Sequence, residues 1–258
     1  MIKFTLITVT YNAEATLERT LRSVAEQSYP HIEHILIDGA SKDRTVEIAK
    51  NYPHLAKVVS EPDRGLYDAI NKGLRLATGD YVCFLNAGDK LHGADTLTKI
   101  SLSLTLPKRE GTMSEPSPLG GDGGGLPGVL YGHTNIVDDE GNFLHPRRLS
   151  PPEQLTWKSF KQGMLVCHQA FYARRDLCPE YDTTFRFSAD FDWCIRVMKQ
   201  TDNLVHLPFT VADYLQEGMT TRNHRASLIE RFRLMCRHYG VLPTLAQHLW
   251  FIIRAIIK

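Results

Sequence analysis

The first hundred residues contain short apolar runs, separated by polar stretches in which apolar residues recur every third or fourth position. Four of the runs are predicted to be strands, over residues 3–9 (KFTLITV), 34–37, 57–60 (KVVS) and 81–85 (YVCFL), and the first and last of these are expected to be buried. A continuous apolar run of this length is typical of a strand that is covered on both faces.

The stretches between these runs predict helices. The spacing of Leu17, Leu21 and Val24 predicts a helix over residues 13–28, and a second apolar stripe predicts a helix that ends before Gly79. Strands that alternate with helices indicate an α/β protein with a Rossmann-like, mostly parallel sheet flanked by helices.

After residue 128 the pattern predicts a β-hairpin, a strand, a helix and two C-terminal helices. The hairpin turns at residues 139–141, the strand is HQAFYAR (168–174), and the helix begins near Ser188. The last two helices are predicted over residues 226–239 and 242–257. We expect a single domain, because one α/β domain of 258 residues can bury a sizeable core.

The segment between these two parts, residues 107–128 (PKREGTMSEPSPLGGDGGGLPG), is rich in Gly, Pro and Ser. It has few side chains that a core could bury, so we expect a flexible surface loop. Its GGDGGG run lacks the Gly-Lys-Ser/Thr ending of a phosphate-binding loop and follows no strong strand, so no phosphate site is expected there.

Polar side chains follow three of the predicted strands, at the ends where ligands of open α/β sheets bind. They are Thr10, Tyr11 and Asn12 after the first strand, Asp38 after the second, and Asn86 and Asp89 after the fourth. With Asp190 at the start of a later helix, Asp38 and Asp89 are the candidate functional carboxylates. The alternative for each is a structural role, as a turn cap or as the partner of a helix dipole.

Composition narrows the classes of partner. Thirty Lys and Arg residues against 29 Asp and Glu give a formal net charge of +1, which argues against nucleic acid as a ligand. The five cysteines are odd in number and form no C-x-x-C pair, so we expect neither a disulfide framework nor a zinc site, and a reducing cytoplasm suits the chain. The N-terminus does not have the pattern of a signal peptide.

The segment LPTLAQHLWFIIRAIIK near the C-terminus is the most apolar part of the chain. It is shorter than the roughly 20 apolar residues that span a bilayer, and Gln247, His248 and Arg254 interrupt it. It fits either packing onto the core or resting on the cytoplasmic leaflet of a membrane.

The three candidate carboxylates fit a nucleoside diphosphate ligand. A nucleobase is recognised by a carboxylate or amide at its polar edge, and a diphosphate binds Mg²⁺ or Mn²⁺ that is held by one or two carboxylates. Transfer of a sugar from such a diphosphate also needs one general base for the acceptor hydroxyl.

Four segments occur along the chain in a specific order. They are TLITVTYNAEATLERTLRSVAEQSYPHIEHILIDGASKDRT, EPDRGLYDAINKGLRLATGDYVCFLNAGD, CHQAFYARRDL and FSADFDWCIRV. Together they resemble an inverting family 2 glycosyltransferase of the GT-A fold, closest to bacterial transferases of the colanic-acid and exopolysaccharide type. The resemblance implies a nucleotide-sugar-binding half over residues 1–100, an acceptor-binding half over 129–225 and C-terminal helices over 226–258.

On the donor side, the resemblance implies contacts to the nucleotide from Thr10, Tyr11, Asn12, Asp38, Asp63, Arg64, Tyr67, Asn71 and Lys72. Asp38 would read the base, and Arg64 and Lys72 would pair with phosphate oxygens. The alternative from spacing alone is an i,i+4 surface pair of Asp68 with Lys72.

The turn Asn86-Ala87-Gly88-Asp89 occupies the position where many relatives carry the metal-binding motif D-x-D-D. The resemblance implies that Asp89 binds Mg²⁺ or Mn²⁺. Asn86 replaces the first Asp of the motif, so its amide oxygen would be an uncharged and weaker ligand.

Asp190 matches the Asp of the family's Glu-Asp motif, which implies that it is the general base for the acceptor hydroxyl. The Glu of that motif is Ala189 in this chain, and Asp192 is expected to supply part of the missing charge. His168 and Gln169 match a pair that lies on the acceptor side of the family's site.

The resemblance therefore implies transfer of a sugar from a nucleoside diphosphate, with UDP expected, to a hydroxyl of a saccharide or polyprenyl-linked saccharide in cell-surface polysaccharide synthesis. We expect a cytoplasmic protein, and the C-terminal apolar segment leaves two alternatives open, peripheral contact at the inner face of the cell membrane or packing onto the core. Two other classes remain open. One is a sugar-phosphate nucleotidyltransferase, although TYNAEAT lacks the Gly-rich, Arg/Lys-bearing sequence expected in that loop. The other is a non-catalytic nucleotide- or carbohydrate-binding protein.

Overall fold

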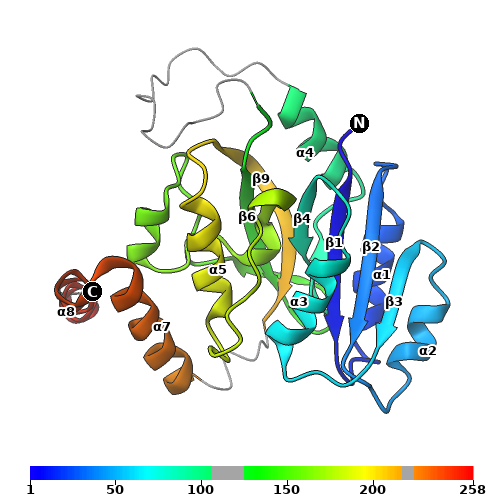
Figure 1. Ribbon diagram of the computed structural model, residues 1–258, viewed down its shortest axis with the longest axis horizontal. Coiled ribbons are helices and arrows are strands. Elements are labelled where there is room, and N and C mark those ends of the chain that lie inside the picture. Colours follow the sequence, from blue (N-terminus) through cyan, green and yellow to red (C-terminus); the bar gives the residue numbers. More distant parts are fainter. Residues whose placement is uncertain (106–124, 217–223, 258) are drawn as a thin grey trace.

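A single mixed sheet runs through the structure, a computed structural model that describes residues 1–105, 125–216 and 224–257 (Figure 1). Its strands in chain order are β1 (Phe4–Thr10), β2 (Ile32–Asp38), β3 (Leu55–Ser60), β4 (Tyr81–Phe84), β5 (Lys90–Leu91), β6 (Val129–Val137), β7 (Phe143–Pro146), β8 (Phe171–Arg174) and β9 (Leu204–Leu215). Across the sheet the order is β3-β2-β1-β4-β8-β6-β9-β5, and β7 pairs with β6.

Helices cover this sheet and extend beyond it at one end. The α-helices are α1 (Leu17–Ala25), α2 (Thr45–Lys50), α3 (Leu66–Leu76), α4 (Thr96–Thr105), α5 (Ala189–Met198), α7 (His224–Tyr239) and α8 (Val241–Ile257). The 3₁₀ helices are η1 (Trp157–Gln162), η2 (His168–Ala170) and η3 (Arg175–Leu177). The pair α7 and α8 lies at the end of the molecule opposite to β3 and α2 (Figure 1).

The N-terminal half of the sheet has the predicted parallel strands. β1 pairs in parallel with β2 and β4, and β2 pairs in parallel with β3. Side chains of β2 alternate between two layers, since Leu36 packs with Leu17 and Leu21 of α1, whereas Ile35 and Ile37 belong to the main core that includes α3. Both faces are covered, which explains the continuous apolar run in the sequence.

Beyond β4 the sheet becomes mixed. β8 is antiparallel to both β4 and β6, β9 is parallel to β6, and the short β5 is antiparallel to β9. The predicted hairpin around residues 139–141 is present as β6 and β7. β9, α4 and η1 were not predicted, and residues 107–124 of the expected flexible loop lie outside the described residues.

The C-terminal helices form a two-helix unit. The rings of Phe232 on α7 and His248 on α8 lie 5.1 Å apart, and the buried Thr244 donates a hydrogen bond to the backbone oxygen of Gly240. Across the described ranges, none of the helices combines the length and the apolar character that a bilayer-spanning segment requires.

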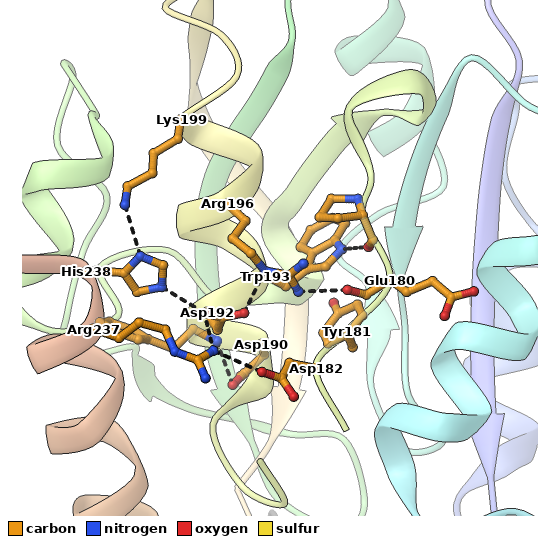
Figure 2. A network of polar contacts seen from close by, with 12 residues as sticks. Glu180, Tyr181, Asp182, Asp190, Asp192, Trp193, Arg196, Lys199, Arg237 and His238 are labelled. Atoms are coloured by element: carbon orange, nitrogen blue, oxygen red, sulfur yellow. Dashed lines mark hydrogen bonds and ion pairs between the residues drawn. The ribbon is translucent and has the colours of Figure 1, made fainter. Parts of the chain in front are cut away.

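Asp192, in the first turn of α5, joins α5 to α7. Its fully buried carboxylate lies 2.6 Å from Nε of Arg196 and 2.7 Å from Nε2 of His238 on α7, as Figure 2 shows. Arg237, also on α7, forms an ion pair with Asp182 at 2.9 Å. Burial disfavours the charged form of Asp192, but the hydrogen bond from His238 and the charge of Arg196 outweigh it, so the pKa of this carboxyl lies below its usual value.

The variant Asp192→Ala is expected to lower the free energy of unfolding by about 3 kcal/mol, because it leaves the buried ring of His238 and the partly buried guanidinium of Arg196 without their carboxylate partner. Urea denaturation followed by circular dichroism measures the change. Asp95→Ala is the matched control: it removes an i,i+4 pair with Lys99 whose side chains are more than half exposed, and it should cost less than about 0.5 kcal/mol. Equal losses in the two variants would show that the link between α5 and α7 is no stronger than a surface pair.

Candidate active site

A cavity of about 640 Å³ opens at the carboxyl end of β1 and beside the turn that follows β4. Ligands of α/β sheets bind at this edge. Eight residues that the sequence singles out line it, namely Thr10, Tyr11, Tyr67, Asn86, Asp89, His168, Gln169 and Asp190. The cavity therefore joins residues from the two halves of the chain.

Asp190 lies in the first turn of α5, and its side chain is 17% exposed. Its Oδ1 accepts hydrogen bonds from the backbone N–H of Phe191 at 2.9 Å and from the hydroxyl of Tyr67 at 3.3 Å. The start of α5 is itself fixed by α7, because the carboxylate of Glu230 accepts hydrogen bonds from the backbone N–H groups of residues 186–188 at 2.7–3.1 Å. Asp190 is thus held in place from α3 and, through the start of its own helix, from α7.

His168 contacts Asp190 and Asn86 at once. Its Nδ1 lies 3.4 Å from Oδ2 of Asp190, and its Nε2 lies 3.3 Å from Nδ2 of Asn86. The tautomer with the proton on Nδ1 satisfies both contacts, since Nε2 can then accept from the amide. Burial disfavours the charge on Asp190, but His168 and the nearby charge of Arg231 outweigh it and hold the pKa of this carboxyl below its usual value. Asp190 is therefore ionised at neutral pH.

Asp89 is almost fully buried at the floor of the cavity. Its Oδ2 accepts a hydrogen bond from the side-chain amide of Gln169 at 2.7 Å, and its Oδ1 accepts one from the backbone N–H of Leu215 at 3.0 Å. Burial raises the pKa of Asp89 to about 6, although both hydrogen bonds favour the charged form. The pKa of Asp89 is therefore close to neutral pH, whereas the pKa of Asp190 lies well below it.

The turn that carries Asp89 is fixed by α1. Thr20 donates a hydrogen bond to the backbone oxygen of Asp89 at 2.6 Å and accepts one from the N–H of Gly88, and Nε of Arg19 donates to the oxygen of Gly88. Gly88 has φ of 103°, and a Cβ there would lie 2.8 Å from a methyl carbon of Leu215. Only glycine fits this turn without strain, so the departure from D-x-D-D at this position is a backbone requirement.

Asn86 provides an unused ligand atom next to Asp89. Its Oδ1 is buried without a hydrogen-bond partner, and so is the hydroxyl of Thr10. An unpaired buried oxygen carries a free-energy cost that a cation or a ligand donor would remove. No group of three or more His, Cys, Asp or Glu side chains within the described residues could hold a metal. A divalent cation at Asp89 and Asn86 therefore fits only if a ligand or water supplies further oxygens, as is usual for Mg²⁺.

Polar side chains connect the loop after β1 to the loop after β2 and fix the end of β2. Asn12, with φ of 47°, accepts a hydrogen bond from the N–H of Lys42 through Oδ1. Asp38 is fully buried and accepts hydrogen bonds from Ser41 and, at 2.6 Å, from the hydroxyl of Ser60. Neither side chain lines the cavity, whereas the ring of Tyr11 does and is 64% exposed.

Four other donor-side residues also lie outside the cavity lining. Asn71 exchanges two hydrogen bonds with the backbone of Tyr181, and Asp63 accepts one from the N–H of Gly65. Lys72 pairs with Glu61 at 2.9 Å, which is neither the phosphate contact nor the pair with Asp68 that the sequence suggested. The fourth, Arg64, donates its backbone N–H to Asp68.

Asp192 does not have the expected place on the acceptor side. It lies two residues after Asp190 on α5, so the two side chains project to different sides of the helix. Its carboxylate faces α7 rather than the cavity (Figure 2). The charge of the missing Glu at position 189 is therefore not replaced by Asp192.

Several lining residues were not foreseen from the sequence, namely Arg147, Arg148, Tyr214 and Arg231. The Arg147-Arg148 dipeptide at the end of a predicted hairpin was a usable signal. Tyr214 lies at the end of β9, which was not predicted, and Arg231 lies among other charged residues on α7, where a solvated face was the natural interpretation.

The sequence is similar to known glycosyltransferases. The family model described as glycosyl transferase family 2 matches residues 5–100. A PGL/p-HBAD biosynthesis glycosyltransferase of Mycobacterium bovis (strain BCG / Pasteur 1173P2) is 34% identical over 223 residues, which cover 83% of this chain and 77% of that protein. The amylovoran biosynthesis glycosyltransferase AmsB of Erwinia amylovora is 29% identical over 227 residues, which cover 83% of this chain and 69% of that protein.

Two solved structures share the fold at 18% sequence identity. One is S. aureus TarS 1-349 in complex with UDP-GlcNAc, with a TM-score of 0.67; the match covers 91% of this chain and 64% of that TarS segment. The other is the mannosyltransferase PcManGT from Pyrobaculum calidifontis in complex with GDP-Man and Mn²⁺, with a TM-score of 0.60 over 95% of this chain and 74% of that protein. These likenesses confirm the predicted GT-A fold.

A relative of one-third identity that shares most of its length with this chain, together with the family match over residues 5–100, defines the enzyme class. The chain belongs to glycosyltransferase family 2.

Proposed function

We propose that this glycosyltransferase moves a sugar from a nucleoside diphosphate, UDP in the first instance, to a hydroxyl of a saccharide or polyprenyl-linked saccharide, with inversion at the anomeric carbon. The observation that carries the proposal is the pair of carboxylates in one cavity, with Asp190 ionised and Asp89 beside the unpaired oxygen of Asn86. Relatives named for PGL/p-HBAD and amylovoran biosynthesis support a role in cell-surface polysaccharide synthesis.

The donor nucleotide binds at the end of β1. The exposed ring of Tyr11 offers a face on which a base can stack, and the unpaired hydroxyl of Thr10 offers a hydrogen bond. Asn12 and Asp38 act indirectly, because their hydrogen bonds set the shape of the loop that presents Tyr11.

The general base is Asp190. It accepts the proton of the acceptor hydroxyl, while the acceptor oxygen forms a bond to the anomeric carbon and the bond to the diphosphate oxygen breaks on the opposite face. The contacts from Tyr67, His168 and the N–H of Phe191 hold one orientation of the carboxylate. A lowered pKa keeps it in the proton-accepting form at neutral pH.

Asp89 and Asn86 hold Mg²⁺ or Mn²⁺, and Gln169 and the N–H of Leu215 orient the carboxylate. When bound, the cation neutralises charge on the leaving diphosphate. Asp89 is the single carboxylate on this side of the described cavity, so the cation would need further oxygen ligands. The diphosphate of the donor would supply them.

The outer face of α8 is proposed to rest on the membrane that carries a lipid-linked acceptor. Besides Val241 at its start, this helix has five large apolar side chains that are at least 39% exposed, namely Leu242, Leu245, Leu249, Trp250 and Ile253. Their spacing places them along one side of the helix, away from the His248 side that packs on α7. Leu228 and Ile229 on the neighbouring α7 are also exposed.

The function is tested first with labelled UDP-sugars and no acceptor. Slow release of UDP is expected, because water can replace the acceptor hydroxyl in a transferase site. Pyrophosphate-dependent exchange would instead indicate a nucleotidyltransferase, and binding without turnover would indicate a binding protein.

Asp190→Asn is expected to reduce kcat for sugar transfer by about 10²- to 10⁴-fold, because the amide cannot accept the proton. Donor affinity, measured by calorimetry with UDP, should stay the same. Asp176→Asn is the control, since its side chain is 62% exposed, pairs with Arg174 and does not line the cavity. Full transfer activity in Asp190→Asn would remove Asp190 from the role of base.

Asp89→Asn is expected to abolish the gain in UDP affinity that Mn²⁺ gives to the unmodified protein, because the metal loses its charged ligand. Calorimetric titration of UDP with and without Mn²⁺ measures this gain, and thermal melting checks that the variant is folded. Asn86→Ala should reduce the gain in part. If Mn²⁺ improves UDP binding equally in Asp89→Asn, the metal is held elsewhere.

The double variant Leu249→Glu with Trp250→Glu is expected to weaken binding to phosphatidylglycerol vesicles by more than about tenfold, since two apolar side chains leave the bilayer interface. Co-sedimentation with the vesicles measures the bound fraction. Val58→Glu, on β3 at the other end of the molecule, introduces one such charge at an exposed apolar position and should have no effect. An unmodified protein that never sediments with vesicles would contradict the membrane contact.

A further inference from the structure

Three arginines line the cavity together with Asp190. Arg147 and Arg148 follow β7, and Arg231 lies near the middle of α7. All three come from the C-terminal part of the chain, beyond the segment that matches the family model. None of them is accounted for by the base, the cation or the nucleotide contacts proposed above.

Arg147 has a structural role. Its guanidinium donates hydrogen bonds to the backbone oxygens of Met164 at 2.7 Å, Leu149 at 2.9 Å and Leu165 at 3.3 Å. These bonds fix the segment after β7, and they leave the next side chain, Arg148, exposed at the cavity.

Arg231 is held in place without using its hydrogen-bond donors. Its guanidinium carbon lies 5.0 Å from the centre of the Phe191 ring, on which it packs as a cation. Within the described residues it forms no ion pair and no hydrogen bond. Burial lowers the pKa of this guanidinium, and the charge of Asp190 only partly opposes the effect. Among the described residues, this partly buried guanidinium therefore has five donors that no protein group uses, and they are available to a ligand in the cavity.

Arg231 lies on the side of the cavity where the acceptor is expected, because it packs on Phe191, the residue next to Asp190. Its electrostatic partner across the cavity is Asp190, the proposed base, whereas the diphosphate is expected at Asp89. A group held by Arg231 would therefore lie next to the hydroxyl that gives up its proton. Arginine forks match the paired oxygens of a carboxylate or phosphate, and a neutral sugar cannot replace that interaction.

We propose that Arg231 and Arg148 form a subsite for a negatively charged group of the acceptor, a carboxylate or a phosphate close to the accepting hydroxyl. The inference rests on the proposed function and narrows it, because the acceptor is then an acidic sugar or a sugar attached to phosphate. The carboxylate and the phosphate share the same recognition chemistry, and the experiment separates them.

The test uses the full chain saturated with UDP, so that the donor subsite is filled. Methyl glucuronide, glucose 1-phosphate and methyl glucoside are titrated as carboxylate, phosphate and neutral probes, and calorimetry gives their affinities. At least one anionic probe is expected to bind more tightly than methyl glucoside by about tenfold or more, the effect of one charge-assisted hydrogen bond. The preferred anionic probe identifies the charged group.

Arg231→Gln is expected to remove this preference and leave UDP affinity unchanged. Arg148→Gln, at an exposed position where folding is not at risk, should reduce the preference in the same direction, and Arg231→Lys should keep only part of it, because lysine retains the charge without the fork. Arg233→Gln is the matched control, since Arg233 is exposed on the same helix and does not line the cavity.

Two results would overturn the inference. One is equal affinity for the anionic and neutral probes in the unmodified protein. The other is a loss of UDP affinity in Arg231→Gln, which would place Arg231 on the donor diphosphate. Failure of the unmodified protein to bind UDP would count against the proposed function instead, so the two failures are distinguishable.

Discussion

The site depends on a carboxylate that stays charged in a largely enclosed place. Asp190 is surrounded by groups that favour its ionised form, namely the N–H of Phe191, the hydroxyl of Tyr67 and Nδ1 of His168. Without them, burial alone would raise its pKa, as it does for Asp89 on the other side of the cavity. Both groups are aspartate carboxyls, so the difference between their pKa values comes from the residues that surround them.

His168 makes the two halves of the chain interdependent. Through its two ring nitrogens it connects Asn86, which follows β4 of the parallel half, to Asp190 at the start of α5. The turn that carries Asn86 is in turn fixed by Thr20 and Arg19 on α1. One imidazole thereby contacts both Asn86, the proposed metal ligand, and Asp190, the proposed base.

Part of the donor side could be placed from the sequence because the geometry there is local, although six of the nine predicted donor-side residues lie outside the cavity lining. Parallel strands end at one edge of a sheet, so Thr10 and Asp89 could be placed together from the apolar runs alone. Asp192 could not be placed, because two residues along a helix turn the side chain by about 200° and only the packing of α7 decides which side is buried. Arg231 could not be predicted at all, since its helix folds back onto the site from the far end of the chain.

The hydrogen bonds from residues 186–188 to Glu230 make α7 part of the site, because they fix the backbone just before Asp190. The family match covers the nucleotide-binding strands, yet the backbone that presents the proposed base is capped by a carboxylate some forty positions later. The segment that matches the family model supplies Asp89 and the parallel strands beside the cavity. α7 supplies the carboxylate that fixes the backbone before Asp190, the proposed base. Divergence in α7 among related chains would alter reactivity and acceptor choice together, while the donor side stayed the same.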